Sequence, residues 1–374
     1  MKRIFFLLSL FIFNSQISQA QEPYQFETVI DLDATPVESQ GITGTCWSFS
    51  TSSFLESEIM RISGKQIDLS EMYSVRNTYP KKAWNYVMRQ GKAQFSEGGL
   101  AHDVINVVKL HGLVPQQAYS GLEAGSDKHN HAEMVAVIKA MLDTYIDNPG
   151  RSLSANWKMA VESVLDTYLG KRPAEFIYDG KSYTPESFLQ MTKLNPEDYV
   201  SITSFDHLPY YQQSILNIPD NFSNGTFYNL PLNEFMQVID AALESGYTLS
   251  LDCDVSERGF SSKNGVAIVP QDASITAKAW TAIYPEVAVD QQLRQQTFES
   301  FSTTDDHLMH ITGTLKDQKG NVYYKVKNSW GTSEDRTAFG GYVYFSESYM
   351  RLKSISVMVH KDALPDSIAK VLKF

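Results

Sequence analysis

The chain has 374 residues, of which 43% are hydrophobic and 12% aromatic, enough for a large buried core in one big domain or two lobes. Its formal net charge is −11, from 32 basic and 43 acidic residues. This balance provides no positive field to attract nucleic acid or anionic lipid, so proteins that bind nucleic acids or membrane surfaces are not expected classes.

The N-terminus has the pattern of a signal peptide. Positive charges at the start precede an apolar run over residues 4–13, which is too short to span a bilayer. Residues 18–20 are Ser-Gln-Ala, which places small residues at the two positions that a signal peptidase reads. We therefore predict that residues 1–20 are removed and that the mature protein is exported to the periplasm or secreted. An uncleaved anchor is the alternative; after cleavage no membrane contact is expected.

Residues 21–124 are predicted to form a helical lobe. Apolar side chains recur at a helix-like period after Cys46 and stop at Gly64, a residue type that commonly ends helices. A second amphipathic stretch covers residues 101–110 and also stops before a glycine. Residues 125–235 carry charged helical segments between polar loops and no cluster of reactive side chains, so they are predicted to be a mainly helical insertion.

Residues 236–374 change to a strand-like pattern rich in β-branched and aromatic residues. The predicted strands cover residues 248–254, 307–315, 321–327, 341–345 and 355–360. A hairpin turn is predicted at Lys319-Gly320-Asn321. The fold class is therefore α+β, with a helical first part and a β-rich second lobe.

The chain has two cysteines, Cys46 and Cys253. A disulfide between them is the plain interpretation for an exported protein, but the surroundings of Cys46 favour a nucleophile. A thiol attacks a carbonyl as the thiolate, so it needs a positive influence that lowers its pKa. The predicted helix that starts at Cys46 offers the positive end of its dipole. Glycines in residues 41–44 leave backbone N–H groups free to hold an oxyanion, and the Gln40 amide is placed to help.

A thiolate also needs a partner that takes up its proton and returns it to the leaving amine, and imidazole suits this role near neutral pH. Among eight histidines, His307 opens an apolar strand pattern, and His310 on the same strand is the runner-up. Asn328, on an adjacent predicted strand, is placed to fix the imidazole tautomer, and Trp330 to shield that hydrogen bond from water. Asp306 either tunes the charge of His307 or faces solvent.

Three motifs together resemble those of the papain-like cysteine peptidases. They are Gln40-Gly-Ile-Thr-Gly-Thr-Cys46-Trp47-Ser48-Phe49, His307 six residues before Gly313, and Asn328-Ser329-Trp330-Gly331. The resemblance implies a two-lobed fold, in which a helical lobe presents Cys46 and an antiparallel, β-barrel-like lobe presents His307 and Asn328 across a cleft. It also implies that Gln40 and the backbone N–H of Cys46 form the oxyanion hole.

The same resemblance implies residues that bind the substrate, which would be a peptide or a protein. Gly98 and Gly99 resemble the glycine pair whose backbone pairs with the substrate chain; a turn that precedes a helix is the alternative interpretation. Trp330 is expected to border the same cleft.

Within this family the chain resembles the bleomycin hydrolase and aminopeptidase C branch, through the helical insertion, through residues 184–188 (TPESF) and through residues 250–255 (SLDCDV). On this resemblance Cys253 is a buried structural thiol. Thr43 stands where many papain-like enzymes have a disulfide cysteine, which fits the branch. Members of the branch form hexamers, so a homo-oligomer is a candidate assembly.

The C-terminus departs from the branch pattern. The branch ends in an arm whose terminal carboxylate lies in the cleft and restricts cleavage to the free N-terminus of a substrate. Here the chain stops soon after the last predicted strand, so the arm is expected to be short or missing. The sequence predicts a cysteine peptidase, with aminopeptidase action favoured. An endopeptidase is the close alternative, and a non-catalytic peptide-binding relative is the third.

His129-Asn130-His131 is the sequence feature that most resembles a metal site. It lacks a third ligand at a suitable spacing, so a solvated loop is the expected structure. Neither a metal ion nor an organic cofactor is expected to take part in the reaction.

Overall fold

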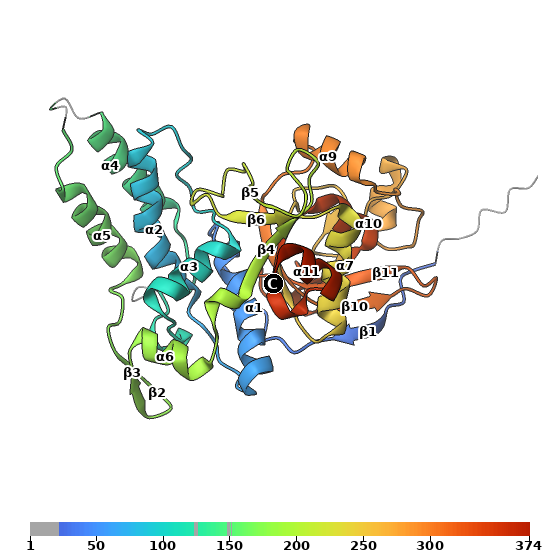
Figure 1. Cartoon of the computed structure of the whole chain (residues 1–374), viewed down its shortest axis with the longest axis horizontal. Coiled ribbons are helices and arrows are strands. Elements are labelled where there is room, and N and C mark those ends of the chain that lie inside the picture. Colours follow the sequence, from blue (N-terminus) through green and yellow to red (C-terminus); the bar gives the residue numbers. More distant parts are fainter. Residues whose placement is uncertain (1–21, 123–125, 148–149, 151) are drawn as a thin grey trace, which may run out of the picture.

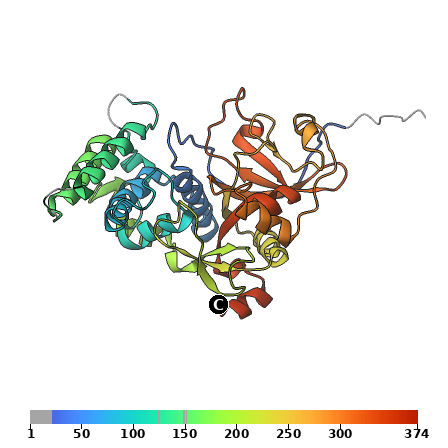
Figure 2. The same ribbon diagram turned by 90° about the horizontal axis from the view of Figure 1, so that it is seen from above.

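The computed structural model describes residues 22–122, 126–147, 150 and 152–374. Residues 1–20, the predicted signal peptide, lie outside the described part. Within that part no helix is both long enough and apolar enough to cross a membrane. A helical half and a half built on a large sheet lie side by side (Figures 1 and 2).

The helical half is formed by α1 to α6. Their bounds are α1 (Cys46–Ser63), α2 (Glu71–Met88), α3 (Ala101–His111), α4 (Ala132–Ile146), α5 (Asn156–Leu169) and α6 (Pro185–Thr192). α1 ends where Gly64 adopts a left-handed conformation with φ of 69°, which glycine takes at little cost. α2 begins after Ser70, whose hydroxyl accepts a hydrogen bond from the backbone N–H of Tyr73.

The other half of the molecule carries the remaining helices. They are α7 (Leu232–Glu244), α8 (Thr276–Ala279), α9 (Gln291–Glu299), α10 (Glu347–Lys353) and α11 (Asp366–Leu372). Single turns of 3-10 helix lie at Gln116–Ala118, Pro196–Asp198, Ala273–Ile275, Phe339–Gly341 and Lys361–Ala363.

In the described part of the chain eleven strands form one sheet, in the order β5-β6-β4-β13-β7-β10-β11-β12-β9-β8, with β1 also paired to β10. The bounds are β1 (Glu27–Asp31), β4 (Tyr199–Thr203), β5 (Gln213–Ile215), β6 (Thr226–Asn229), β7 (Leu249–Cys253), β8 (Phe260–Ser261), β9 (Val266–Ala267), β10 (His307–Lys316), β11 (Val322–Lys327), β12 (Tyr342–Ser346) and β13 (Ser354–His360). The hairpin of β2 (Phe176–Tyr178) and β3 (Lys181–Tyr183) is separate.

The sheet is open rather than closed into a barrel. Its strands are mainly antiparallel, but β4 and β6 are parallel, as are β9 and β12. The predicted hairpin turn at residues 319–321 connects β10 to β11, which are antiparallel. The β-barrel-like shape expected of this lobe is therefore replaced by a long sheet that also extends toward the helical half.

Both faces of the central sheet are covered. α1 packs on β10 and β7, and the Ser50 hydroxyl donates a hydrogen bond to the Met309 carbonyl at 2.5 Å. Leu308 belongs to the core shared with the helical half, whereas Met309 packs with the core beneath α7 and α11, as the alternation of side chains along a strand requires. The ring of Phe374 stacks edge-on against Tyr228 of β6, 5.2 Å between centroids, so the C-terminal residues lie on the face away from α1.

The segment 125–235, predicted to be mainly helical, supplies α4 to α6 but also the strands β4, β5 and β6. β4 lies inside the sheet, between β13 and β6, and is largely buried. Its five residues, Tyr-Val-Ser-Ile-Thr, are too few to show a period that separates a buried strand from a helix. The predicted boundary at residue 235 stays a prediction.

Candidate active site

Cys46 is the first residue of α1 and is 7% exposed, with a free thiol. The preceding loop is held by the backbone of His129. Gly41 has a φ of 67°, and a Cβ there would overlap the His129 carbonyl, so this position requires glycine. The Ile42 backbone N–H donates a hydrogen bond to the same carbonyl at 2.8 Å. These contacts fix the turn that leads into α1.

His307 is the first residue of β10 and is 4% exposed. Its Nε2 lies 2.8 Å from Oδ1 of Asn328, which also accepts a hydrogen bond from the Ser329 backbone N–H. Because Oδ1 is an acceptor, Nε2 carries the proton and Nδ1 keeps its lone pair. The ring of Trp330 lies 4.9 Å from the His307 ring, centroid to centroid, and limits the access of water to this hydrogen bond.

The fold brings Cys46 and the start of β10 together. α1 packs along β10, and the backbone N–H of Leu308, the residue after His307, forms a hydrogen bond with the Cys46 thiol. Asn328 directly follows β11, the strand paired with β10. The thiol therefore comes from the helical half, whereas the imidazole and its amide partner come from the sheet.

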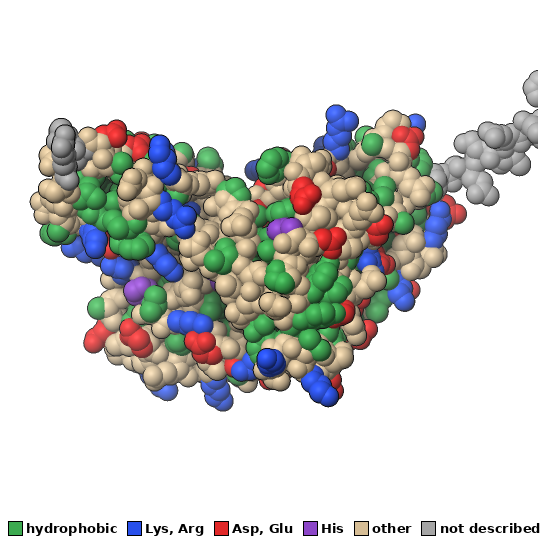
Figure 3. All heavy atoms as spheres, turned by 45° about the horizontal axis from the view of Figure 1, so that its top comes forward, with side chains coloured by type: hydrophobic (Ala, Val, Ile, Leu, Met, Phe, Trp, Pro, Cys, Tyr) green, Lys and Arg blue, Asp and Glu red, His purple; other side chains and the backbone are tan. Residues whose placement is uncertain are grey.

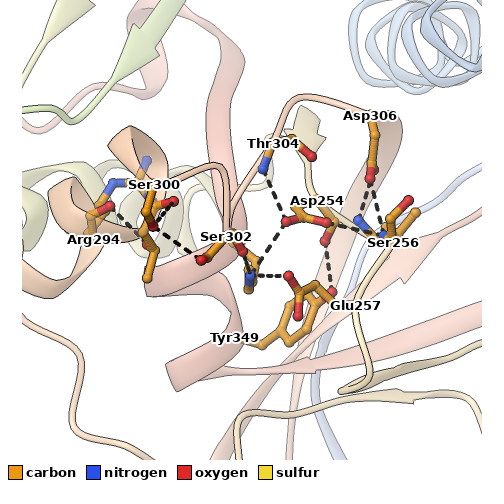
Figure 4. A network of polar contacts seen from close by, with 12 residues as sticks. Asp254, Ser256, Glu257, Arg294, Ser300, Ser302, Thr304, Asp306 and Tyr349 are labelled. Carbon is orange, nitrogen blue, oxygen red and sulfur yellow. Dashed lines mark hydrogen bonds and ion pairs between the residues drawn. The ribbon is translucent and has the colours of Figure 1, made fainter.

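Asp306 fixes the backbone that leads into His307. Its carboxylate accepts hydrogen bonds from the backbone N–H groups of Val255 at 2.9 Å and Ser256 at 3.1 Å (Figure 4). Burial lowers the pKa of His307, and the hydrogen bond to Asn328 and the charge of Asp306 partly oppose that effect. Asp306 thus both positions this loop and acts on the charge of the imidazole.

The expected lowering of the thiol pKa is wrong. Burial raises the pKa of Cys46 to about 12, and the charges of Asp220 and Asp305 add to the increase. The backbone N–H groups of Leu308 and Trp47 lower it by less. The helix N-terminus is present, but the free-energy cost of removing a thiolate from water exceeds the stabilisation that these two N–H groups provide.

Gln40 lies in the loop before the nucleophile and is 7% exposed. Its Nε2 donates a hydrogen bond to the Thr43 carbonyl at 2.6 Å, and its Oε1 accepts one from the Ser329 hydroxyl at 2.6 Å. The side chain is thus held between the helical half and the residue after Asn328. A primary amide has two N–H groups, so one remains beyond the bond to Thr43.

Gly98 and Gly99 precede α3. A Cβ on Gly99 would lie 3.1 Å from atoms of the Trp47 indole, so this glycine allows the backbone to pack on that ring. A Cβ on Gly98 would overlap the carboxylate of Asp220. The Gly98 carbonyl accepts a hydrogen bond from Lys82. The pair thus stands in the turn before a helix, and Gly98 faces a side chain from the inserted segment.

An open pocket on the surface adjoins the candidate catalytic residues. Its lining comprises residues 39–44, Glu97, Ala132, Trp330 and Arg336. These residues belong to both halves, so the predicted residues Gln40 and Trp330 border a pocket that is open to solvent. The outline of the surface is notched between the helical half on the left and the sheet on the right (Figure 3).

The structure separates the other candidates from this site. His310 is completely buried, and its Nδ1 lies 2.9 Å from the Ser53 hydroxyl beneath α1. Burial lowers its pKa well below the ordinary value, which argues against its role as the base. Cys253 is buried and free and donates to the His307 carbonyl at 3.4 Å, so the alternative of a disulfide with Cys46 is not found.

The loop of His129 and His131 is not solvated as expected, since the two side chains are 8% and 3% exposed. They pack edge-on against Phe49 and Tyr79. The residues that neighbour His129 and His131 in the sequence do not reveal these aromatic partners, which are distant along the chain.

Three carboxylates, those of Glu56, Asp68 and Glu71, lie close enough together to surround a cation in the described part of the chain. The Lys327 ammonium already acts on all three. Glu56 and Glu71 are buried and Asp68 is exposed, and their charges are balanced in part by that lysine.

Sequence reasoning missed three acidic residues beside the site, Asp220, Asp252 and Asp305. Asp252 lies in the same motif as Cys253, residues 250–255, and Asp305 precedes Asp306. The sequence patterns assigned no role to either residue. Asp220 lies in the inserted segment, and no local pattern connects it with Gly98.

Comparisons with known proteins identify the family of the chain. The model of the Peptidase C1-like family matches residues 168–374, more than half of the chain. The chain belongs to the Peptidase C1-like family. The model of the papain family of cysteine proteases matches residues 23–159. The chain is thus a cysteine peptidase, and the predicted papain-like branch of bleomycin hydrolase and aminopeptidase C is confirmed.

Relatives align along most of this peptidase. "Cysteine proteinase 1, mitochondrial" of Saccharomyces cerevisiae (strain JAY291) is 23% identical and covers 96% of the chain and 81% of its own length. Aminopeptidase C of Lactobacillus delbrueckii subsp. lactis is 23% identical, over 95% of the chain and 86% of its own. The crystal structure of PepW from Lactobacillus rhamnosis superposes with a TM-score of 0.72 at 19% identity, over 93% and 84% of the two chains, which confirms the α+β, papain-like fold.

The expected export is contradicted by these comparisons. The yeast relative that covers 96% of the chain is named as a mitochondrial protein. The expectation rested on residues 1–20 alone, which lie outside the described residues. A short N-terminal stretch with positive and apolar residues is shared by several kinds of targeting segment, so its composition did not fix a destination.

Proposed function

We propose that this cysteine peptidase hydrolyses peptide bonds through an acyl-enzyme on Cys46 and removes residues from the N-terminus of its substrates. The observation that carries the proposal is the hydrogen bond of 2.8 Å from His307 Nε2 to Asn328 Oδ1. It leaves the Nδ1 lone pair free to accept a proton, and the backbone N–H of the next residue, Leu308, bonds to the Cys46 thiol.

Burial favours the neutral form of both side chains, so we propose that proton transfer accompanies attack. His307 Nδ1 takes the thiol proton as Sγ forms a bond to the substrate carbonyl carbon. The C–N bond then breaks, and the imidazolium gives this proton to the leaving amine. In the second half of the reaction, His307 takes a proton from water, which attacks the thioester and releases the carboxylic acid while the proton returns to sulfur.

The carbonyl oxygen gains negative charge in each tetrahedral intermediate. The backbone N–H of Cys46 and the remaining side-chain N–H of Gln40 are the donors proposed for it. The bond from Ser329 to Gln40 Oε1 orients this amide, and the oxyanion hole is therefore coupled to the residue that follows Asn328.

Removal of N-terminal residues is supported by relatives named aminopeptidase C and aminopeptidase G, each 23 to 24% identical over most of the chain. The test compares a peptide substrate with a free N-terminus and the same substrate with an acetylated one. We expect the free form to be cleaved and the acetylated form to resist. Equal cleavage of both would identify an endopeptidase.

Cys46→Ala should reduce turnover of the free peptide by at least about 10⁴-fold, as loss of a catalytic nucleophile does. Cys253→Ala removes the other thiol, which is buried, and serves as the matched control that keeps activity. Turnover is measured by release of a fluorescent leaving group. Activity that survives in Cys46→Ala would contradict the assignment of the nucleophile, and wild-type protein that cleaves no peptide would favour a binding role.

A further inference from the structure

Asp220 occupies space beside the glycine pair expected to bind the substrate backbone. A Cβ on Gly98 would overlap the Asp220 carboxylate, so this carboxylate fills the position next to the Gly98 backbone. A substrate chain running along the glycines would meet a negative charge there instead of an open groove. A side chain from the inserted segment thus stands against the backbone of the glycine pair.

The loop that carries Asp220 is held in place by its neighbour. Asn221 is 6% exposed, and its Nδ2 donates hydrogen bonds to the carbonyls of Leu216 at 2.9 Å and Gly225 at 3.0 Å. Its Oδ1 accepts a hydrogen bond of 2.7 Å from the Gly225 backbone N–H. Gln94, a neutral amide, donates to the Asp220 carboxylate at 3.1 Å. The carboxylate thus has a fixed position without a direct ion pair among the described residues.

Two further carboxylates lie behind Asp220. The backbone N–H of Asp220 points to the Asp305 carboxylate, which lies beside that of Asp252. Asp252 is 3% exposed, and its Oδ1 has no hydrogen-bond partner among the described residues; both carboxyl oxygens of Asp305 are likewise buried. Carboxyl oxygens buried with so few donors are costly, and a positive charge held at Asp220 would offset part of that cost.

Two buried cations act on this group: Lys82 on Asp220 and Arg294 on Asp252. Burial and the neighbouring carboxylates raise the pKa of Asp252 well above its ordinary value and that of Asp305 to about 7, and burial also raises the pKa of Asp220. The ammonium of Lys82 is the cation that opposes the charge of Asp220, but it donates to the Gly98 carbonyl. A substrate cation at Asp220, the least buried of the three carboxyl groups, would add to this partial compensation.

This acidic group is close to the reacting atoms. The charges of Asp220 and Asp305 both raise the pKa of the Cys46 thiol, and Asp305 lies two residues before His307. A ligand cation held here would be a short distance along a peptide from the carbonyl that Cys46 attacks.

We propose that Asp220, supported by Asp305 and Asp252, binds the protonated α-amino group of the substrate and blocks peptides that extend beyond it. The proposal rests on the proposed aminopeptidase function and names the residues that enforce it. The C-terminal residues pack on the opposite face of the sheet, through Phe374 and Tyr228, so the negative charge at the cleft comes from the insertion. The substrate class is peptides with a free, cationic N-terminus.

The test uses full-length protein with leucyl-aminomethylcoumarin and its N-acetyl derivative. Asp220→Asn should raise the KM for the free substrate by about tenfold or more, the loss expected for a hydrogen bond to a charged group, with a smaller change in kcat. Asp220→Ala, which also opens space, should gain cleavage of the acetylated substrate. Asp305→Asn is a second variant, for which a raised KM is expected too.

The control is Asp179→Asn, which removes the same charge from the exposed turn between β2 and β3 and should keep wild-type kinetics. Near-ultraviolet circular dichroism like that of the wild-type protein verifies that each variant is folded. Unchanged KM and unchanged preference for the free substrate in Asp220→Asn, Asp220→Ala and Asp305→Asn would overturn the proposal. Wild-type protein that cleaves both substrates equally would instead overturn the aminopeptidase function, before any variant is compared.

Discussion

The resting charges of the two reacting side chains are set by burial. Burial raises the pKa of the Cys46 thiol to about 12 and lowers that of the His307 imidazole. Burial therefore favours the neutral form of each group when no substrate is bound. Thiolate forms only when the proton can pass to His307 while Sγ attacks, which couples ionisation of the nucleophile to the presence of a carbonyl.

This resting state predicts how alkylation of Cys46 depends on pH. Since the thiol pKa lies above 9, the thiolate fraction and the rate of reaction with iodoacetamide should rise about tenfold for each pH unit between about pH 7 and pH 9. Asp220→Asn removes a charge that raises this pKa, so its rate at pH 8 should be higher. The measurement is the rate of adduct formation by mass spectrometry, in a Cys253→Ala background. A rate that is already constant from pH 6 upward would show a stable thiolate and imidazolium pair and contradict this account.

The strand β10 is positioned by the loop before it as well as by its neighbours in the sheet. Asp254 at the end of β7 accepts a hydrogen bond of 3.1 Å from the Thr304 backbone N–H (Figure 4). Lys353 lies 3.4 Å from Asp254 and also donates to Glu257 and to the Ser302 carbonyl. One buried lysine thus joins the end of α10, the end of β7 and the loop that leads to His307.

Lys353→Met should leave the buried Asp254 carboxylate without its cation and lower the free energy of unfolding by about 3 kcal/mol, as removal of one partner of a buried ion pair does. Activity should fall as well, because the loop before His307 loses an anchor. Lys361→Met is the matched control: this lysine is more exposed and pairs with Asp198 at 2.7 Å, so little change in stability is expected. Urea denaturation measures both. Equal stability of the two variants would show that the Lys353 contacts do not hold this loop.

Elements with a clear local pattern could be predicted from the sequence. The helix after Cys46 and the helix over 101–110 are α1 and α3, and the strand expected at 307–315 is β10. The short strand β4 could not be predicted, because five buried residues show no period and their pairing with β13 is a tertiary contact. The raised thiol pKa was missed for a related reason, since burial comes from residues that are distant along the chain.

At the scale of the molecule, the site depends on two separate cores. One core joins α1 to α6 with one face of the sheet, and the other lies beneath α7 and α11 on the opposite face. The motifs at residues 40–49 and 328–331 identified the candidate catalytic side chains because these are local sequence signals. The contact between Asp220 and Gly98 depends on how the insertion folds, and no motif in the sequence predicts it.

The central claim is that the Cys46 sulfur and the His307 Nδ1, from opposite halves of the molecule, lie within proton-transfer distance of each other. Dibromoacetone has two alkylating carbons separated by a single carbonyl, so it can bridge only side chains that share one site. Treatment of the wild-type protein followed by proteolysis and mass spectrometry should yield a peptide containing Cys46 linked to the peptide containing His307, and His307→Ala should give Cys46 alkylated without a link. A reagent that couples Cys46 to another residue, or never couples it to His307, would contradict the account.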